Sequence, residues 1–312
     1  MPLRIFQLFK PKEHDRLAAL SATAEAASKA GDSKQAIDLY DEIIRLRPEQ
    51  AAPYYQRGNL QKNCGQWEAA LASYDGAVAR DPAHAKAWCN RGVVLEQLQR
   101  LAAADDSYER ALAHNPQDAL AYYNRAAVLR KLGRTEESLA SYDRALAVEP
   151  GFVAAHCNRG MLLAELQRSA EAAASYERAI EIDPHFSPAY FYRGALLHER
   201  RESAAALASY DRAIELNPDY AEAHSNRGVL LTEQQQWSAA LASLERAIAL
   251  RPEFAEAYSH RGNWFAQLKR NDAALADFDR AIALDSGCAN AFYNRANTLI
   301  EMRQFAAAVA SY

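Results

Sequence analysis

The chain has 312 residues and a formal net charge of −4 at pH 7, with 50% hydrophobic and 24% charged residues. This composition is typical of a soluble folded protein and excludes an intrinsically disordered chain. The small negative charge provides no attraction to nucleic acids or to anionic membrane surfaces, so we expect neither as a partner.

Residues 1–16 form an apolar and basic lead segment ahead of the first regular pattern. Its apolar residues, among them Leu3, Phe6 and Leu8, are interrupted by Arg4 and followed by the charged run KPKEHDR. A secretory signal peptide needs a longer apolar run and a small-residue cleavage site. No run in the chain approaches the ~20 apolar residues that span a bilayer. We therefore expect a cytoplasmic protein.

A proline recurs every 34 residues along the rest of the chain. The prolines are Pro48, Pro82, Pro116, Pro150, Pro184, Pro218 and Pro252, and Ser286 occupies the next place. This period predicts eight copies of one structural unit. The predicted repeats span 17–50, 51–84, 85–118, 119–152, 153–186, 187–220, 221–254 and 255–288. An incomplete ninth repeat spans 289–312 and stops within its second helix, so we expect the encoded protein to continue.

Each repeat is predicted to form two antiparallel helices. In the third repeat, Trp88 and Leu95 lie at helical spacing before a polar break, and Tyr108 and Leu112 follow it. Glycine occupies this break in three repeats, where a helix end favours positive φ: Gly31, Gly65 and Gly133. The recurring proline then ends the second helix, because it cannot donate a backbone hydrogen bond.

Two further columns of residues predict how the helices pack. Small residues recur where two helices must cross closely, and an aromatic residue on the second helix is expected to fill the groove to the next repeat. The small residues are Gly58, Gly92, Gly160, Gly194, Gly228 and Gly262, with Ala70, Ala104, Ala172, Ala206, Ala240 and Ala274. The aromatic column holds Tyr40, Tyr74, Tyr108, Tyr142, Tyr176 and Tyr210, continued by Leu244 and Phe278.

This pattern resembles the tetratricopeptide repeat (TPR), and the resemblance covers residues 17–312. The third repeat carries the family's residues as Trp88, Gly92, Leu95, Ala104, Tyr108, Ala111 and Pro116. One position departs from the family, since arginine replaces the leucine that usually precedes the glycine. The resemblance implies an all-α fold, a right-handed α-solenoid (superhelix) whose first helices line a concave face. One hairpin cannot bury its apolar faces alone, so neighbouring repeats complete its core.

Two charged rows follow the same period. The first row, directly before the glycine, is Arg57, Arg91, Arg125, Arg159, Arg193, Arg227, Arg261 and Arg295. The second row, directly after the aromatic residue, is Asp41, Asp75, Glu109, Asp143, Glu177, Asp211, Glu245 and Asp279. We expect the rows to form ion pairs within or between repeats. The alternative is a basic stripe that binds an anion, but opposite charges at matched spacing would neutralise it.

An asparagine precedes that arginine in five repeats: Asn90, Asn124, Asn158, Asn226 and Asn294. A side-chain amide both donates and accepts hydrogen bonds, so such a column on the concave face can hold an extended peptide by its backbone. The column resembles the asparagine ladder in the repeat arm of O-linked N-acetylglucosamine transferases. The alternative is that each amide bonds to a neighbouring helix.

The asparagine column needs apolar contacts beside it. Five net hydrogen bonds give at most about 7 kcal/mol, against an association cost of roughly 4 to 15 kcal/mol. Residues one position earlier are predicted to supply these contacts: Tyr55, Tyr123, Phe191 and Tyr293. The alternative is that their rings pack between repeats.

No catalytic signature is present: the chain has no HExxH, no GxSxG and no glycine-rich phosphate loop. The four cysteines lie far apart without zinc-ligand spacing, which favours free thiols. We therefore predict no enzyme, no cofactor and no metal in this chain.

The predicted function is a protein–protein interaction scaffold that binds an extended peptide segment of a partner in its groove. An alternative is the substrate-recognition arm of a larger glycosyltransferase-like enzyme, with a catalytic domain after Tyr312. The incomplete last repeat could also drive end-to-end self-association.

Overall fold

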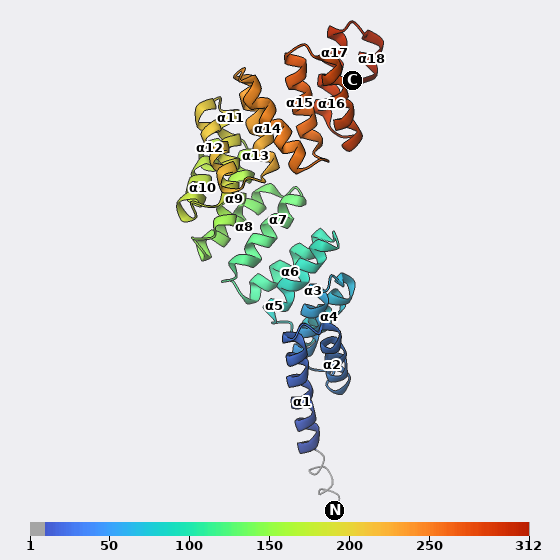
Figure 1. The fold of residues 1–312 in the computed structure, drawn as a ribbon. Coiled ribbons are helices and arrows are strands. Elements are labelled where there is room, and N and C mark those ends of the chain that lie inside the picture. The colour runs from blue at the N-terminus through green and yellow to red at the C-terminus, as the bar shows by residue number, and fades with distance from the viewer. Residues whose placement is uncertain (1–9, 312) are drawn as a thin grey trace, which may run out of the picture. The chain divides into compact units, whose positions relative to one another are not determined.

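The computed structural model describes residues 10–311, which form eighteen helices and no strand (Figure 1). The first helices of the repeats are α1 (Lys10–Lys29), α3 (Ala51–Asn63), α5 (Ala85–Gln97), α7 (Ala119–Lys131), α9 (Val153–Glu165), α11 (Ser187–Glu199), α13 (Ala221–Glu233), α15 (Ala255–Gln267) and α17 (Ala289–Glu301). The second helices are α2 (Ser33–Leu46), α4 (Trp67–Arg80), α6 (Leu101–His114), α8 (Thr135–Val148), α10 (Ser169–Ile182), α12 (Ser203–Leu216), α14 (Trp237–Leu250), α16 (Asn271–Leu284) and α18 (Phe305–Ser311).

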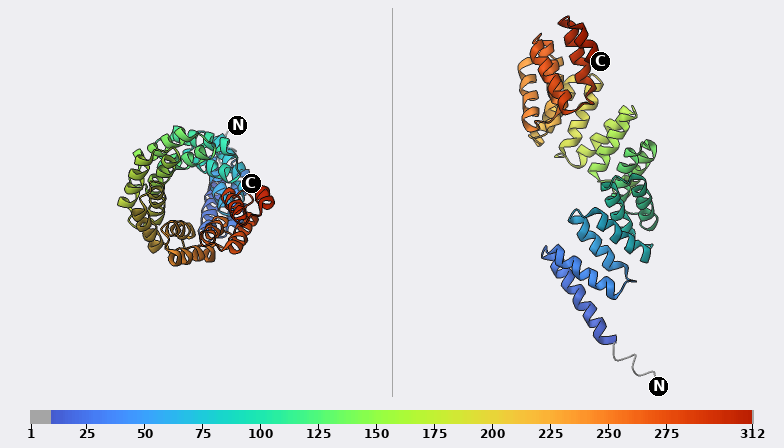
Figure 2. Two further views of the ribbon diagram at one scale, coloured as in Figure 1. Left: turned by 90° about the horizontal axis from the view of Figure 1, so that it is seen from above. Right: turned by 90° about the vertical axis from the view of Figure 1, so that its right-hand side faces the viewer.

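The chain divides into two compact units. Unit 1 ends at Ala155 and unit 2 begins at His156, inside α9. Within each unit, a helix packs against its pair partner and against the next pair, so successive pairs stack side by side (Figure 2). The all-α fold of stacked helix pairs predicted from the 34-residue period is therefore confirmed.

Helix starts follow the predicted repeats closely. From α3 onward, every first helix begins at the residue that opens its repeat, as α3 does at Ala51 and α9 at Val153. The first repeat differs, because α1 begins at Lys10 rather than at Leu17. Residues 10–16 of the predicted lead segment thus continue the first helix, and the rest of that segment lies outside the described residues. No helix within residues 10–311 has the length and apolar character needed to cross a membrane.

The turn between the two helices of a repeat requires a left-handed residue. The predicted glycines have positive φ angles of 82° at Gly31, 71° at Gly65 and 74° at Gly133. The same conformation is adopted, with φ between 57° and 62°, by Gln99, Gln167, Arg201, Gln235, Lys269 and Arg303. The stacked pairs therefore impose this turn even where a side chain makes left-handed backbone unfavourable.

The recurring proline shapes the end of each second helix through the residue before it. Asp81, before Pro82, has φ −132° and ψ 87°, the extended backbone that a following proline demands. Its carboxylate accepts a hydrogen bond from the backbone N–H of Ala83 at 3.1 Å. Asp285 adopts the same conformation before Ser286, so the turn also forms without proline.

In six helix pairs within residues 10–311, a glycine of the first helix lies against a large side chain of the second, which is an aromatic ring in five pairs and Leu244 in the sixth. Alanine takes the place of the glycine at Ala24, Ala126 and Ala296. A Cβ atom on Gly92 would lie 2.8 Å from the ring of Tyr108, so no side chain fits there. The predicted close crossing is confirmed. The aromatic column was expected to fill the groove to the next repeat, and it does this only in part. Tyr74 packs on Gly58 of its own repeat and shares a cluster with Val94 of the next repeat.

The stacking brings first helices close to one another. Within unit 1, α3 contacts α5 and α5 contacts α7, while within unit 2, α11, α13, α15 and α17 contact each other in succession. Among the described residues of each unit, no two successive second helices contact each other to this extent. The first helices therefore lie on the inner side of each stack, and one face of each remains turned away from its second helix.

We predict that replacing Gly92 by valine destabilises unit 1 by about 1–3 kcal/mol, because the added atoms would overlap the buried ring of Tyr108. The matched control is Gly151→Ala, since a Cβ at Gly151 meets nothing within 4 Å. Its effect should stay within about 0.5 kcal/mol. Urea unfolding followed by circular dichroism measures both changes, and equal midpoints for the two variants would contradict the packing argument.

Candidate functional site

The arginine row is occupied by contacts within the protein. Arg91 donates from Nε to Asp75 of the preceding repeat at 2.6 Å and from Nη1 to Ser107 of its own repeat at 2.7 Å. The same pairing with the preceding acidic residue joins Arg57 to Asp41, Arg227 to Asp211 and Arg295 to Asp279. The predicted ion pairs are confirmed at these positions. The arginine heads tie successive repeats together and do not form an open basic stripe.

Two arginines use a different acidic partner. Arg261 forms a bidentate pair with Asp277 of its own repeat, at 2.7 and 2.8 Å. Arg125 pairs with Asp105 of the preceding repeat at 2.6 Å, and Arg134 pairs with the same carboxylate. Asp105 is only 4% exposed and occupies a place that is Leu71 or Leu139 in the neighbouring repeats. A buried carboxylate between two guanidinium groups thus joins the third and fourth repeats.

We predict that Asp105→Asn lowers the stability of unit 1 by about 2 kcal/mol, because it removes the buried carboxylate from Arg125 and Arg134. Among the described acidic residues, Arg125 then keeps only the exposed Glu109, at 3.9 Å. Asp75→Asn is the matched control, since the Asp75 side chain is half exposed and its ion pair is solvated. We expect a loss below about 1 kcal/mol there. Urea midpoints of the two variants give the comparison, and a loss at Asp75 as large as at Asp105 would refute the assignment.

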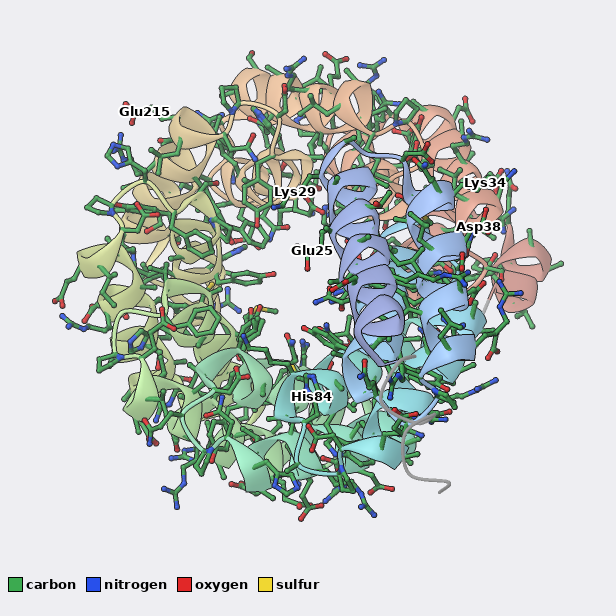
Figure 3. The ribbon with its side chains drawn as sticks, turned by 90° about the horizontal axis from the view of Figure 1, so that it is seen from below. Glu25, Lys29, Lys34, Asp38, His84 and Glu215 are labelled. Atoms are coloured by element: carbon green, nitrogen blue, oxygen red, sulfur yellow. The ribbon has the colours of Figure 1, made fainter. Side chains whose placement is uncertain are left out.

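The asparagine column lies on the first helices, at the position before the arginine, which we call the ladder position. In the first repeat, Glu25 and Lys29 lie three and seven residues after this position. Both point away from α2, whose Lys34 and Asp38 point to the opposite side (Figure 3). We call this side of the first helices the open face. It includes the ladder position and the positions three and seven residues after it.

The five asparagines differ in how the protein uses them. Asn90 donates from Nδ2 to Oδ1 of Asn59 at 2.9 Å, and the Tyr74 hydroxyl donates to the same oxygen at 2.8 Å. The alternative of bonding to a neighbouring helix therefore holds for Asn90. Asn124 and Asn294 are half-buried and form no side-chain hydrogen bond with any residue between 10 and 311. Asn158 and Asn226 are also half-buried on α9 and α13.

The predicted aromatic contacts lie mostly within the protein. The ring of Tyr55 lies 4.7 Å from that of His84, and the ring of Tyr123 lies 4.9 Å from that of Phe152. Both tyrosines are half-buried between repeats. Phe191 is only 9% exposed, because its ring packs against Tyr192, Tyr210 and Tyr220. Its role as a peptide contact stays a prediction, and the ring offers little surface for it. Tyr293 is 58% exposed and keeps an accessible ring.

Three hollows follow the open face of unit 2. The α9–α11 hollow, of about 200 Å³, is lined by Met161, Glu165, Tyr176, Tyr192 and Glu199 among others. The α11–α13 hollow, of about 510 Å³, includes His198, Glu199, Tyr210, Asn226, Glu233 and His260. The α15–α17 hollow, of about 270 Å³, includes Asn263, Lys269, Asn294, Asn297 and Glu301. Each hollow contains a residue at the ladder position. These residues are Tyr192 in the α9–α11 hollow, Asn226 and His260 in the α11–α13 hollow, and Asn294 in the α15–α17 hollow.

The sequence analysis missed most of these lining residues. Asn263 and Asn297 lie three residues after the ladder position, and Glu233 and Glu301 lie seven residues after it. Positions three and seven residues apart share one face of a helix. The periodicity that located the asparagines could therefore have located these residues too.

The pKa values of two groups in the α11–α13 hollow, half-buried His260 and buried Tyr210, are shifted by their surroundings. His260 accepts or donates a hydrogen bond at Nδ1 with the Ser225 hydroxyl at 2.8 Å, and burial lowers its pKa to about 4. Burial raises the pKa of Tyr210 to about 12, and the nearby charge of Glu233 raises it further while Asn226 opposes the shift. Both side chains are therefore neutral hydrogen-bonding groups at pH 7.

We predict that stability falls as the pH drops from about 6.5 toward 4, because the unfolded chain then binds a proton at His260 that the folded protein excludes. His260→Asn should reduce this fall, since asparagine does not titrate. His185→Asn is the control, because the His185 side chain is 81% exposed. Urea midpoints at pH 7 and pH 5 test this, and identical pH dependence in wild type and His260→Asn would contradict it.

Two cysteine thiols lie one residue before the ladder position. Burial raises the pKa of the Cys89 and Cys157 thiols to about 12, so both are neutral and poor nucleophiles at pH 7. Within residues 10–311, no three His, Cys, Asp or Glu side chains gather closely enough to hold a metal ion. Amides, hydroxyls and carboxylates between helices remain, which suit hydrogen bonding to another polypeptide.

Profiles of tetratricopeptide repeats match most of the chain. They cover residues 55–119, 100–147 and 123–185, then 175–208, and further 202–235, 230–269 and 255–288. No curated protein sequence matches the chain.

Solved structures of similar fold are numerous. The crystal structure of YrrB, described as a TPR protein with an unusual peptide-binding site, is 28% identical. It has a TM-score of 0.52 and covers 59% of this chain and 95% of its own. A tetratricopeptide repeat protein from Parabacteroides merdae is 21% identical, with a TM-score of 0.67 and coverage of 80% and 98%. The Pseudomonas aeruginosa protein pilF is 22% identical, with a TM-score of 0.59 and coverage of 70% and 99%.

Proposed function

Because the chain belongs to the tetratricopeptide repeat family, whose members are protein-interaction scaffolds, we propose that it binds an extended peptide segment of a partner protein along the open face. The row of hollows between the first helices of unit 2 carries this proposal. Each hollow combines polar side chains with apolar walls, such as Asn226 beside Val229. This combination suits a peptide segment, whose backbone is polar and whose side chains can be apolar.

An extended segment is favoured over a folded surface because of where the polar groups stand. Hollows recur between successive first helices, so a ligand must run from one repeat to the next to reach several of them. An extended backbone exposes N–H and C=O groups at every residue, and an asparagine can pair with both. Asn294 retains this capacity in the α15–α17 hollow.

Apolar area must supplement these hydrogen bonds, since the bonds alone do not offset the cost of association. Tyr293 presents an exposed ring one residue before Asn294. Met161 and Val229 add apolar walls to the other two hollows. Because Phe191 exposes little surface, Met161, Val229 and Tyr293 supply the proposed apolar contacts of unit 2.

The similarity to YrrB supports the same class of ligand, because the description of YrrB names a peptide-binding site and the two chains are 28% identical. The asparagine column also resembles the repeat arm of O-linked N-acetylglucosamine transferases, and that resemblance remains a sequence-based prediction.

The test uses Asn124→Ala combined with Asn294→Ala in the full chain, probed with an immobilised array of short random peptides. Neither asparagine side chain forms a hydrogen bond with a residue between 10 and 311, so the loss of both should leave helicity unchanged and weaken binding about tenfold. The weakening should extend across peptides of different sequence, because the amides would contact the backbone.

The control for this test is Glu215→Ala on α12. Glu215 points outward, away from the first helices of unit 2, and its side chain is 69% exposed (Figure 3). Its binding profile should match that of the wild type. Undiminished binding by the double asparagine variant, or no peptide binding by the wild type, would refute the proposed function.

A further inference from the structure

The charge of the open face is set by the position seven residues after the ladder position. In unit 1 this position holds Lys29, Asn63, Gln97 and Lys131, whereas in unit 2 it holds Glu165, Glu199, Glu233, Gln267 and Glu301. All nine side chains are exposed. Unit 2 therefore carries a column of carboxylates on the open face, and unit 1 does not.

The carboxylates of this column gather around two adjoining hollows. Glu165 and Glu199 line the α9–α11 hollow, and Glu199 and Glu233 line the α11–α13 hollow. Glu199 forms no ion pair with any described residue. Glu233 shares a hydrogen bond of 2.8 Å with the imidazole of His198. Two carboxylates thus face each hollow, and Glu199 is common to both.

Basic residues offset this charge only in part. Arg201 lines the α11–α13 hollow, and no lysine or arginine lines the α9–α11 hollow among the described residues. In the α11–α13 hollow, one guanidinium therefore faces the carboxylates of Glu199 and Glu233. The α15–α17 hollow differs, because Lys269 forms an ion pair with Glu301 at 2.9 Å. The carboxylate of Glu301 in this hollow is therefore already paired with a cation.

The floor of the α11–α13 hollow holds a polar group without a partner. Tyr210 is fully buried, and its hydroxyl lies near Asn226 but forms no hydrogen bond of normal geometry with a described residue. Leaving a buried hydroxyl unpaired costs free energy. A polar group of a ligand bound in the hollow could provide the hydrogen-bond partner that the Tyr210 hydroxyl lacks.

We infer that the adjoining α9–α11 and α11–α13 hollows bind a basic side chain, arginine or lysine, of the peptide segment. This inference rests on the proposed function and specifies the chemistry of the ligand. The cationic head lies between Glu199 and Glu233, where charge-assisted hydrogen bonds are stronger than neutral ones. The amide of Asn226 contacts the neighbouring backbone of the segment, above the unpaired hydroxyl of Tyr210. The volume of about 510 Å³ accommodates one long side chain with its backbone.

The experiment compares labelled peptides made of repeated Ser-Val-Xaa-Gly units, in which Xaa is arginine, glutamine or glutamate. Fluorescence anisotropy with the full chain measures each affinity at low and at high salt. We expect the arginine peptide to bind about tenfold more tightly than the glutamine peptide, and the glutamate peptide to bind most weakly. High salt should remove the difference, because the carboxylates are solvent-exposed.

A matched set of variants locates the preference. Glu199→Gln combined with Glu233→Gln should abolish the preference for arginine while binding of the glutamine peptide persists. Glu215→Gln removes one carboxylate on the outer side and should keep the preference.

The outcomes separate the two proposals. Equal affinity for the arginine and glutamine peptides overturns the inference and leaves the proposed function intact. Binding of no peptide overturns both. A preference that survives in the double variant overturns the assignment to these hollows.

Discussion

The close contact between a glycine of the first helix and a ring of the second helix sets the geometry on which the rest of the structure depends. A Cβ at Gly92, Gly160 or Gly194 would lie within 3 Å of a tyrosine ring, so the two helices meet at the closest distance their backbones allow. This contact buries one side of the first helix in the repeats that carry it. Neighbouring repeats then cover its flanks, as expected for a hairpin that cannot form a core alone. The open face is the surface that remains. Its side chains lie outside this contact, although some of them contact an adjoining repeat.

The arginine row adds little positive charge to the open face. Arginine replaces an apolar residue of the family pattern in every repeat from the second onward. At Arg91 and Arg227 its head bonds to an aspartate of the preceding repeat and a serine of its own. Arg261 pairs instead with Asp277 of its own repeat, and Arg193 donates to Ser209 without an ion pair to a described residue. Cations such as Arg91 are therefore neutralised inside the stack and connect successive pairs. The charge that faces a ligand comes instead from residues one helical turn or more beyond the ladder position. In unit 2 those residues are predominantly glutamates.

The candidate site thus divides into two kinds of position with different physical roles. In the proposed function, amides such as Asn294 pair with a peptide backbone whatever the sequence of the ligand. In the further inference, carboxylates such as Glu199 pair with a cationic side chain and select among ligands. A repeat protein separates these roles easily, because each repeat presents the same few positions to the ligand. Changing one position alters specificity while the contacts that hold the helix pairs remain. His260 and Tyr210 line the α11–α13 hollow, and their surroundings keep both side chains neutral at pH 7.

Much of the fold could be predicted from the sequence, because its causes are local or periodic. The period located the start of each first helix from Ala51 onward, the glycines with positive φ and the pairing of Arg91 with Asp75. The tertiary structure decided which side chains of the open face remain available. Phe191 is buried by rings from three other positions, and Asn90 is bonded to Asn59 of the preceding repeat. Helical spacing assigns a residue to a face, but its contacts depend on the size and chemistry of the residues in the adjoining repeats. For the same reason, the hollows around Glu199 and Tyr210 exist only where those particular neighbours leave space.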